Sequence, residues 1–498
     1  MTVSSKKLSY RRPPYAACLL VLALFLPLAL AGCASMAPSY ERPHLPVEVV
    51  YPGDVAITGA GQFAAATGWQ DYFADQHLRK LITTALENNR DLRIAVSRVE
   101  AARAAYGIQR AEQFPTLGIV ADGTRSLVPG DLNVTGKPLT GGVYQAGLGV
   151  SAWELDLWGR VRSLKAGALE NYLATGEARR AVIISLIAHV ANGYLTLREL
   201  DERLVFARQT IDSRQESLRI FRRRVEVGST SRLDLIQVET LWQQAKTLGA
   251  QLEQAQALQA HALTLLIGAT VDFGPTPGNF DDAGVLSELI VGLPSDLLLQ
   301  RPDIMAAEHQ LKAANANIGA ARATFFPRIA LTGSLGTASA ALDGLFGPGS
   351  LAWSLGANLA MPIFDGGRNR GNLKLTEAQR NEAVAQYEKT VQSAFRDVSD
   401  ALSNRQWLTD QVQTLQAMQA AQSERARLAK MRYDNGAAAF LEVLDAQRDL
   451  LAVAQQLVQT RRALLSSRVD LYAALGGGAQ HLAVTKSANP PIDRNKDN

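Results

Sequence analysis

Two segments of the chain alternate apolar and polar residues with a period of two. Each follows a segment of weaker alternation, about Thr116–Arg125 or Arg328–Thr337, and a loop rich in glycine and proline, 126–140 or 338–349. Successive side chains of a strand point to opposite faces, so the pattern predicts two β-hairpins whose strands each have one apolar face. A run of about 9–11 such residues fits a strand that crosses a bilayer, but a half-buried soluble sheet gives the same alternation. The apolar positions of the clearer strands are Tyr144, Ala146, Leu148, Val150 and Ala152, and Leu351, Trp353, Leu355, Ala357, Leu359 and Met361.

A second pattern follows each hairpin, in which apolar residues recur at alternating steps of four and three. It predicts helices from about 161 to 227 and from 369 to 434, each on the order of 100 Å long. A sustained spacing of about 3.5 residues is a coiled-coil seam. The helices reverse direction where Gly228 and Gly436 can supply left-handed C-caps. The seam residues, several of them small, are Leu186, Val190, Gly193, Leu197, Leu200, Leu204, Ala207 and Ile211, then Leu241, Ala245, Leu248, Leu252 and Ala255.

The hairpin and its long helices occur twice, so the chain contains a duplicated α-β-β-α half. Gly107 and Phe114 recur 212 residues later as Gly319 and Phe326, and Gly228 recurs 208 residues later as Gly436. A unit of this length is a duplicated domain half, not a solenoid repeat. We expect repeat one at 68–275 (hairpin 114–155, long helices 161–267), repeat two at 276–476 (hairpin 326–364, long helices 369–475), a flexible tail at 477–498, and shorter helices at 71–87, 91–113 and 303–324.

The first 32 residues have the composition of a secretion signal. Basic residues precede an apolar run, Ala16–Leu30, which ends at Leu-Ala-Gly-Cys. A spanning helix needs about 20 apolar residues, so this shorter run predicts a cleaved signal. The small residues before Cys33 resemble a bacterial lipobox, which implies lipid attachment to Cys33, and Ala34 after it implies sorting to the outer membrane. A chance run of small residues is the alternative. Residues 33–67 contain prolines without periodicity and predict an extended tether.

Composition and charge exclude several classes of function. Of 498 residues 47% are hydrophobic, enough for a large core. The chain has 51 basic and 47 acidic residues. Four of the basic residues lie in the signal, so the rest of the chain has equal numbers of both signs. The charge therefore gives no support for nucleic-acid binding. The other cysteine, Cys18, lies in the signal, which leaves no disulfide. No HExxH motif, cysteine–histidine cluster or phosphate loop occurs. We therefore expect no metal, no cofactor beyond a lipid on Cys33, and no enzymatic activity.

The number of strands predicts that the chain assembles with copies of itself. Four strands cannot close a barrel in lipid, because open edges leave backbone groups unpaired at several kcal/mol each. Known membrane barrels begin at about eight strands. Three copies would supply twelve strands around an open lumen. The expected fold is thus mainly α with a membrane β-barrel portion, in which a shared 12-stranded trimeric barrel continues into a long coiled-coil α-barrel.

Three motifs carry a resemblance to a known family: Ala-x-x-Thr-Phe-Phe-Pro-Arg at 321–328, Pro-Ile-Phe-Asp-Gly-Gly-Arg at 362–368, and Tyr-Asp-Asn-Gly followed by Leu-Glu-Val-Leu-Asp-Ala-Gln at 433–447. The chain resembles the outer-membrane efflux factors of the TolC and OprM type, particularly the NodT-like lipoprotein branch, over nearly all of 68–476. The resemblance implies a homotrimer in outer-membrane lipid, a periplasmic adaptor and an inner-membrane pump of the RND type. It implies a passive exit duct for drugs or other small toxic compounds.

Two other functions stay open at this point. One is the exit duct of a protein-secretion (type I) system. The other, from a different class, is a structural coiled-coil envelope lipoprotein with a soluble hairpin domain. The efflux reading depends on the family resemblance, since fold alone does not determine function.

The resemblance also implies a periplasmic gate at the helix tips. Glu442 and Asp445 match acidic residues that form constricting rings, and three copies of a carboxylate near a pore axis would attract cations and repel one another. Asp234 and Tyr433 match a latch in which an aspartate bonds to a tyrosine and an arginine, but Ala438 stands where that arginine is expected. The alternative is that these acids are solvated residues at helix starts, where the macrodipole favours them.

The turns at the tips would meet the adaptor. The resemblance places adaptor contacts at five residues that flank these turns. For the glycines a role as helix caps is a complete alternative, and for the arginines a solvated surface position. The five residues are Arg224, Gly228, Ser231, Arg432 and Gly436.

Overall fold

The computed structural model describes residues 35–44, 46–48, 51, 62–274, 289–290 and 296–479. The expected signal, Cys33 and most of the expected tail therefore lie outside the described residues. Contacts divide the chain into two compact units. The first comprises residues up to Pro43, Glu100–Leu173 and His309–Ala385, and the second comprises His44–Val99, Ala174–Glu308 and Gln386 onward. Four helices contribute residues to both units: α4 (Arg90–Ala111), α5 (Arg160–Glu226), α8 (Pro302–Ala323) and α9 (Arg368–Asp434).

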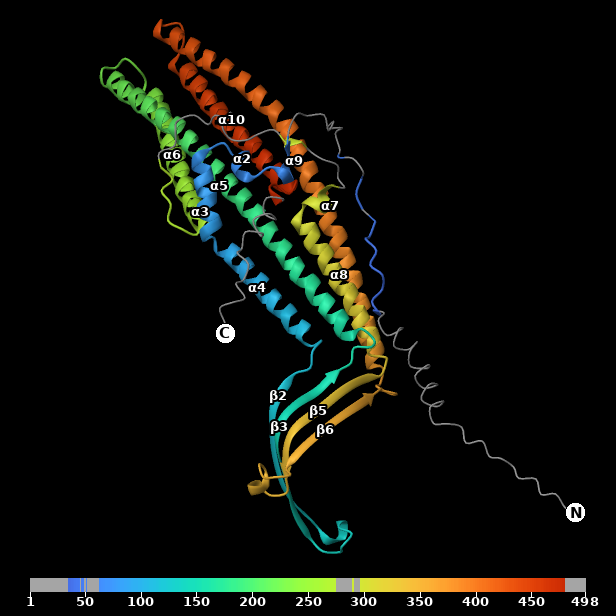
Figure 1. Cartoon of the computed structure of the whole chain (residues 1–498). Coiled ribbons are helices and arrows are strands. Elements are labelled where there is room, and N and C mark those ends of the chain that lie inside the picture. The colour runs from blue at the N-terminus through green and yellow to red at the C-terminus, as the bar shows by residue number, and fades with distance from the viewer. Residues whose placement is uncertain are drawn as a thin grey trace, which may run out of the picture. The chain divides into compact units, whose positions relative to one another are not determined.

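The first unit contains one antiparallel sheet of four strands, in the order β2, β3, β5, β6 (Figure 1). The strands are β2 Leu117–Val128, β3 Leu139–Glu154, β5 Arg328–Ser339 and β6 Leu351–Ala360. Short 3-10 helices, Gly130–Leu132 and Leu342–Gly344, lie between the strands of the two hairpins. Both predicted hairpins are thus confirmed. They pair with each other through β3 and β5, which leaves β2 and β6 as the two edges.

The pairing of β3 with β5 is interrupted near the end of the predicted alternation. The register shifts between Val150 and Trp153, and Ala152 between them has a φ of 25°. Such a bulge bends a strand and increases its twist. Beyond it, Glu154 still pairs with Ala330, so β3 extends past the residues whose alternation was clear.

Helix α8 (Pro302–Ala323) holds part of the predicted tether against its surface in the first unit. Asn315 Nδ2 donates to Pro38 O at 2.7 Å, and a Cβ on Gly319 would lie 2.6 Å from Ala37 N. Close approach of the two backbones therefore requires glycine at 319. Residues 37 and 38 of the expected tether are therefore docked on α8, and its last part contains the 3-10 helix Ala64–Ala66.

The second unit contains two long antiparallel helix pairs. They are α5 Arg160–Glu226 with α6 Arg232–Ile267, and α9 Arg368–Asp434 with α10 Phe440–Ala474 (Figure 1). These bounds confirm the long helices. The remaining elements are β1 Gln62–Phe63, 3-10 helix Ala64–Ala66, α2 Trp69–Tyr72, α3 Gln76–Asn88, α4 Arg90–Ala111, β4 Leu289–Ile290 and α7 Leu297–Gln300.

The prediction of a single helix at 71–87 is wrong, because α2 ends at Tyr72 and α3 begins only at Gln76. Asp75 has extended backbone angles, and its side chain accepts hydrogen bonds from the backbone N–H groups of His77 and Leu78. An aspartate in this role starts a new helix. The expected helices at 91–113 and 303–324 are confirmed as α4 and α8 within two residues at each end.

The predicted coiled-coil seam is the packed interface of α5 and α6. Leu200, Leu204 and Leu252 form one buried cluster with Ala207. A Cβ on Gly193 would lie 2.7 Å from Leu263 Cδ2, so the small residue allows the helices to approach closely. Helix α5 also contains an 18-residue window apolar enough to cross a membrane, with a mean hydropathy of 1.4. Half of that window is buried, as the core helix of a bundle would be.

The duplication is visible where each returning helix ends. Gly268 after α6 and Gly476 after α10 have φ values of 76° and 75°. A Cβ on Gly268 would lie 2.5 Å from Asn88 O, and one on Gly476 would lie 2.6 Å from Gln300 O. Each repeat therefore seats the end of its returning helix against the same point of the chain, just before α4 or α8.

Candidate functional site

The helix tips have the same turn in both repeats. Gly228 and Gly436 each have a φ of 73°, the left-handed conformation predicted for the C-caps. Ser229 N donates to Arg224 O, and Ala437 N donates to Arg432 O, each at 2.8 Å. These are the bonds of a Schellman motif. Both glycines are thus explained as caps, and a contact with an adaptor stays a prediction.

In the first hairpin, Asp234 is part of a capping box. Ser231 Oγ accepts from Asp234 N at 3.1 Å, and Asp234 Oδ2 accepts from Ser231 N at 3.2 Å and from Ser231 Oγ at 2.7 Å. The bonds from Ser231 and Thr230 lower the pKa of Asp234 below its ordinary value. The three donors to Asp234 Oδ2, which are Thr230 Oγ1, Ser231 N and Ser231 Oγ, all belong to the turn itself, and the expected bond of Asp234 with Tyr433 stays a prediction.

In the second hairpin, the capping serine is replaced by Ala439, which makes no side-chain cap. The acid that matches Asp234 is Glu442, and it accepts from Arg432 Nη1 at 3.0 Å. One turn further along α10, Asp445 lies 3.1 Å from Arg448. Each of the two expected gate acids therefore forms an ion pair with an arginine of the same chain.

An aromatic cluster joins the two hairpins near their tips. The rings of Phe221 on α5 and Phe440 on α10 have centroids 4.6 Å apart, and Phe440 lies 4.9 Å from Tyr433 on α9. Arg224 lies over both neighbouring rings, 5.5 Å from the Phe221 centroid and 5.6 Å from that of Tyr433. Its Nη1 also donates to the Tyr433 hydroxyl. Sequence reasoning missed Phe221 and Phe440, whose only signal is their position beside the turns.

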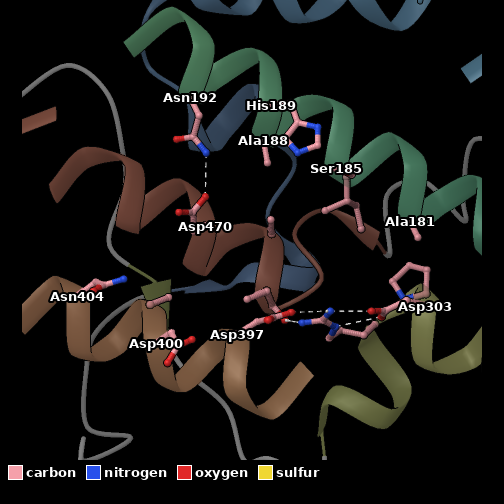
Figure 2. A pocket seen from close by; sticks show the side chains of 16 residues that line it. Ala181, Ser185, Ala188, His189, Asn192, Asp303, Asp397, Asp400, Asn404 and Asp470 are labelled. Atoms are coloured by element: carbon pink, nitrogen blue, oxygen red, sulfur yellow. Dashed lines mark hydrogen bonds and ion pairs between the residues drawn. The ribbon is translucent and has the colours of Figure 1, made fainter. Parts of the chain in front are cut away.

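A cavity of about 500 Å³ lies in the second unit, farther from the turns of the tips (Figure 2). Arg301 on its wall is bound by Asp303 at 2.6 Å and Asp397 at 3.4 Å, and donates to Ala474 O. Asn192 donates to Asp470 at 2.8 Å, and burial raises the pKa of Asp470 above its ordinary value. Among the described residues, no group of three or more histidines, cysteines and acids could hold a metal ion. The cavity therefore has the character of a structural ion-pair site.

The sheet of the first unit has two chemically different faces. Along β6, Leu351, Trp353 and Leu355 are 74%, 74% and 78% exposed. Their neighbours in sequence are small or polar, and Ser354 is hydrogen-bonded to Ser334 of β5 at 2.7 Å. Bare apolar side chains on one face and small polar ones on the other are what a strand between lipid and a water-filled lumen requires.

Such a sheet, continued by coiled-coil helices as long as α5 and α9, defines a channel subunit of the outer membrane. Comparison with known proteins agrees. The model of the outer membrane efflux protein family matches residues 81–269 and 293–477, one segment in each repeat. The chain belongs to this family.

Relatives with established names place the chain among efflux channels. It is 46% identical over 464 residues to the solvent efflux pump outer membrane protein SrpC of Pseudomonas putida, with 92% of this chain and 98% of that one covered. It is 42% identical over 471 residues to the outer membrane protein OprJ of Pseudomonas aeruginosa, covering 94% and 97%. The open-state structure of the Neisseria gonorrhoeae outer membrane channel MtrE matches with a TM-score of 0.80 at 37% identity, covering 90% and 99%. The protein is therefore an outer-membrane channel of an efflux system, which implies a partner pump and adaptor.

Proposed function

We propose that three copies of this chain form a lipid-anchored duct that carries drugs or organic solvents out through the outer membrane. The sheet is the observation that carries the proposal. Its edge strands β2 and β6 each have one unpaired side, and an unpaired edge in hydrocarbon costs several kcal/mol per backbone group. Pairing β6 of one copy with β2 of the next satisfies every edge, and three copies give a twelve-stranded barrel.

A contact inside the chain supports this assembly. Where repeat one meets repeat two, Trp158 Nε1 donates to Pro327 O at 2.8 Å and the indole stacks 4.8 Å from Phe326. The repeat counterpart of Phe326 is Phe114, which is 63% exposed. Phe364, in the loop after β6, is 91% exposed. A neighbouring copy would cover both surfaces as repeat one covers Phe326.

The lipid anchor and the partners complete the proposal. A lipid on Cys33 would lie three residues before Met36, whose carbonyl oxygen accepts from Arg322 on α8 at 3.4 Å. The duct needs no cofactor besides that lipid. The turns of Gly228 and Gly436 would meet a periplasmic adaptor, which couples the duct to an inner-membrane pump of the RND type. The substrates are of the kinds that relatives' names give, solvents and drugs.

Purified protein reconstituted in planar bilayers tests the proposal. We expect crosslinked trimers, single-channel conductance, and loss of solvent or drug tolerance when the gene is deleted. The Cys33→Ser variant should lose the lipid, detected by mass, and keep conductance because the barrel inserts on its own strands. A monomer that conducts nothing would refute the proposal.

The gate within this duct has a test of its own. We propose that three copies each of Glu442 and Asp445 surround the pore axis at the tips. Replacing both by alanine should raise the resting conductance, because the carboxylate side chains that would narrow the pore axis are removed. Glu424→Ala is a matched control, since that acid binds Arg427 on the exposed face of α9. Unchanged conductance in the double variant would exclude these two acids from the gate.

A further inference from the structure

A cavity of about 740 Å³ lies in the first unit, where the sheet joins the helices. Its walls come from the end of β3 and the start of α5, from the end of α8 and the start of β5, and from the end of β6 and the start of α9. All of the lining residues belong to one chain and one unit. Pockets that take drug-sized molecules have volumes of about 300–1,000 Å³, so this cavity is large enough for such a molecule.

The charged side chains that line this cavity are three arginines and two acids, so the lining has a surplus of positive charge. They are Arg160, Arg328 and Arg368, and Glu154 and Asp156. Both acids are already engaged. Glu154 lies 2.8 Å from Arg160 Nη2 and 2.8 Å from Arg328 Nε. Asp156 accepts from the backbone N–H groups of Val161 and Arg162 at 3.0 and 2.8 Å, and pairs with the Arg162 side chain at 3.3 Å.

Two of the arginines keep donors for a further partner. A guanidinium presents a fork of several N–H donors, so one carboxylate shared by Arg160 and Arg328 leaves donors on both unused. The Arg328 side chain is also 58% exposed. Arg368 is the first residue of α9, and among the described residues its side chain forms no hydrogen bond or ion pair. The cavity can therefore accept an anion without breaking an existing pair.

Much of the remaining wall is apolar. The indole of Trp158 stacks on the ring of Phe326 with centroids 4.8 Å apart. Met361 is 52% exposed, and Pro362 follows it on the same wall. An apolar wall beside partly satisfied guanidinium groups suits a molecule that has an apolar body and one anionic group, because Arg binds carboxylates and similar groups and also stacks on flat rings.

The exposed arginine of the cavity lies on the face of the sheet that the proposed duct turns to its lumen. Arg328 is directly across from Ala360 of β6, and Ser334 lies an even number of residues further along β5. Side chains of a strand alternate, so Arg328 shares the small polar face of Ser334. A compound that moves through the lumen would therefore pass Arg328.

We propose that this cavity binds amphipathic organic anions, compounds with an apolar body and a carboxylate or sulfonate group, on their way through the duct. The anionic group accepts hydrogen bonds from Arg328, and Arg368 adds positive charge. The apolar body lies against Trp158 and Met361. The inference rests on the proposed duct and names a class of substrate that its wall favours.

Equilibrium dialysis of the full-length protein in lipid nanodiscs tests the site, with empty nanodiscs to subtract partition into lipid. Three probes share one aromatic ring system: naphthoate is anionic, naphthamide is neutral and naphthylmethylammonium is cationic. We expect naphthoate to bind about tenfold more tightly than naphthamide, the effect of one charged hydrogen bond, and the cation to bind more weakly than either. Arg328→Gln should weaken naphthoate binding about tenfold and leave naphthamide binding unchanged. Arg328→Lys keeps the charge and should still prefer naphthoate to naphthamide.

Arg125→Gln is the matched control, because it removes the same charge from the other face of the sheet. Arg125 lies an even number of residues along β2 from Ile119, which is 86% exposed on the apolar face. This variant should bind naphthoate as the wild type does.

Two results would refute the site: equal affinities of the wild type for naphthoate and naphthamide, or an unchanged naphthoate affinity in Arg328→Gln. If Arg328→Gln binds neither probe, Arg328→Lys decides, and loss of its preference for naphthoate refutes the site. The lining belongs to one chain, so the site and the duct can fail separately. A conducting trimer without naphthoate binding refutes the site alone, whereas a monomer that binds naphthoate and conducts nothing refutes the duct.

Discussion

Replacement of Glu199 by glutamine should destabilise the helical unit far more than the same change at an exposed glutamate. Glu199 on α5 is 5% exposed and accepts from two arginines, Arg203 Nη1 and Arg462 Nε, each at 2.9 Å. The second of these comes from α10, so the carboxylate joins the two helix hairpins. Removing its charge leaves two guanidinium groups close together without the carboxylate that binds both.

The size of the effect follows from burial. Breaking a buried ion pair by removing one partner costs about 3–5 kcal/mol. The Arg203 and Arg462 side chains keep 17% and 33% of their exposure, and Gln455 still accepts from Arg203. Solvent and this amide therefore relieve part of the cost, and we expect a loss of about 3 kcal/mol, the lower end of that range.

Glu253→Gln is the matched control, because Glu253 binds Arg208 at 3.1 Å with both side chains more than half exposed. Exposed pairs contribute about 0–1 kcal/mol, and salt screens them. Urea unfolding followed by far-ultraviolet circular dichroism, at one fixed protein concentration, gives both values. Equal losses for Glu199→Gln and Glu253→Gln would refute the reasoning. Replacing Glu199, Arg203 and Arg462 together by leucine should recover part of the loss, since no charge is then left buried.

Two further changes test the tether and the first tip. Gly319→Val should release the tether from α8, because the new Cβ would lie 2.6 Å from Ala37 N. Limited proteolysis should then cut the chain near Ala37. Gly107→Val is the control: a Cβ at that position meets nothing within 4 Å, so the cleavage should not change. The bonds from Ser231 lower the pKa of Asp234, so its cap is intact above the ordinary carboxyl pKa of about 4 and is lost as the pH falls through the lower folded value. Asp234→Asn should abolish this acid-dependent rise in hydrogen exchange at the start of α6, and an unchanged pH profile would contradict the assignment.

Elements with a regular pattern could be predicted from the sequence. The period of two gave β5 and β6 within two residues at each end, and the alternating steps of four and three gave the seam of α5 and α6. Gly228 and Gly436 marked the turns because a left-handed C-cap strongly favours glycine. Such local signals act within one element and do not depend on the rest of the fold.

Contacts between distant residues could not be predicted in this way. The docking of residues 36–40 on α8 depends on Asn315 and Gly319, almost 280 residues away in the chain. The break at Asp75 was missed because helix periodicity continues across it while the side chain caps the next helix. The capping box of Asp234 was within reach, since Ser231 precedes it at the spacing of that motif.

The divergence of the two repeats explains why the tips are asymmetric. Repeat two forms the Arg432–Glu442 pair, and repeat one has an arginine and an acid at the same positions, Arg224 and Asp234. Serine at 231, where repeat two has Ala439, places the first acid in a cap and leaves Arg224 without that partner. A tyrosine at 433, whose counterpart in repeat one is Val225, then provides an acceptor on the other hairpin. The pair of Arg432 with Glu442 therefore lies within one hairpin, whereas the bond of Arg224 with Tyr433 joins α5 of one hairpin to α9 of the other.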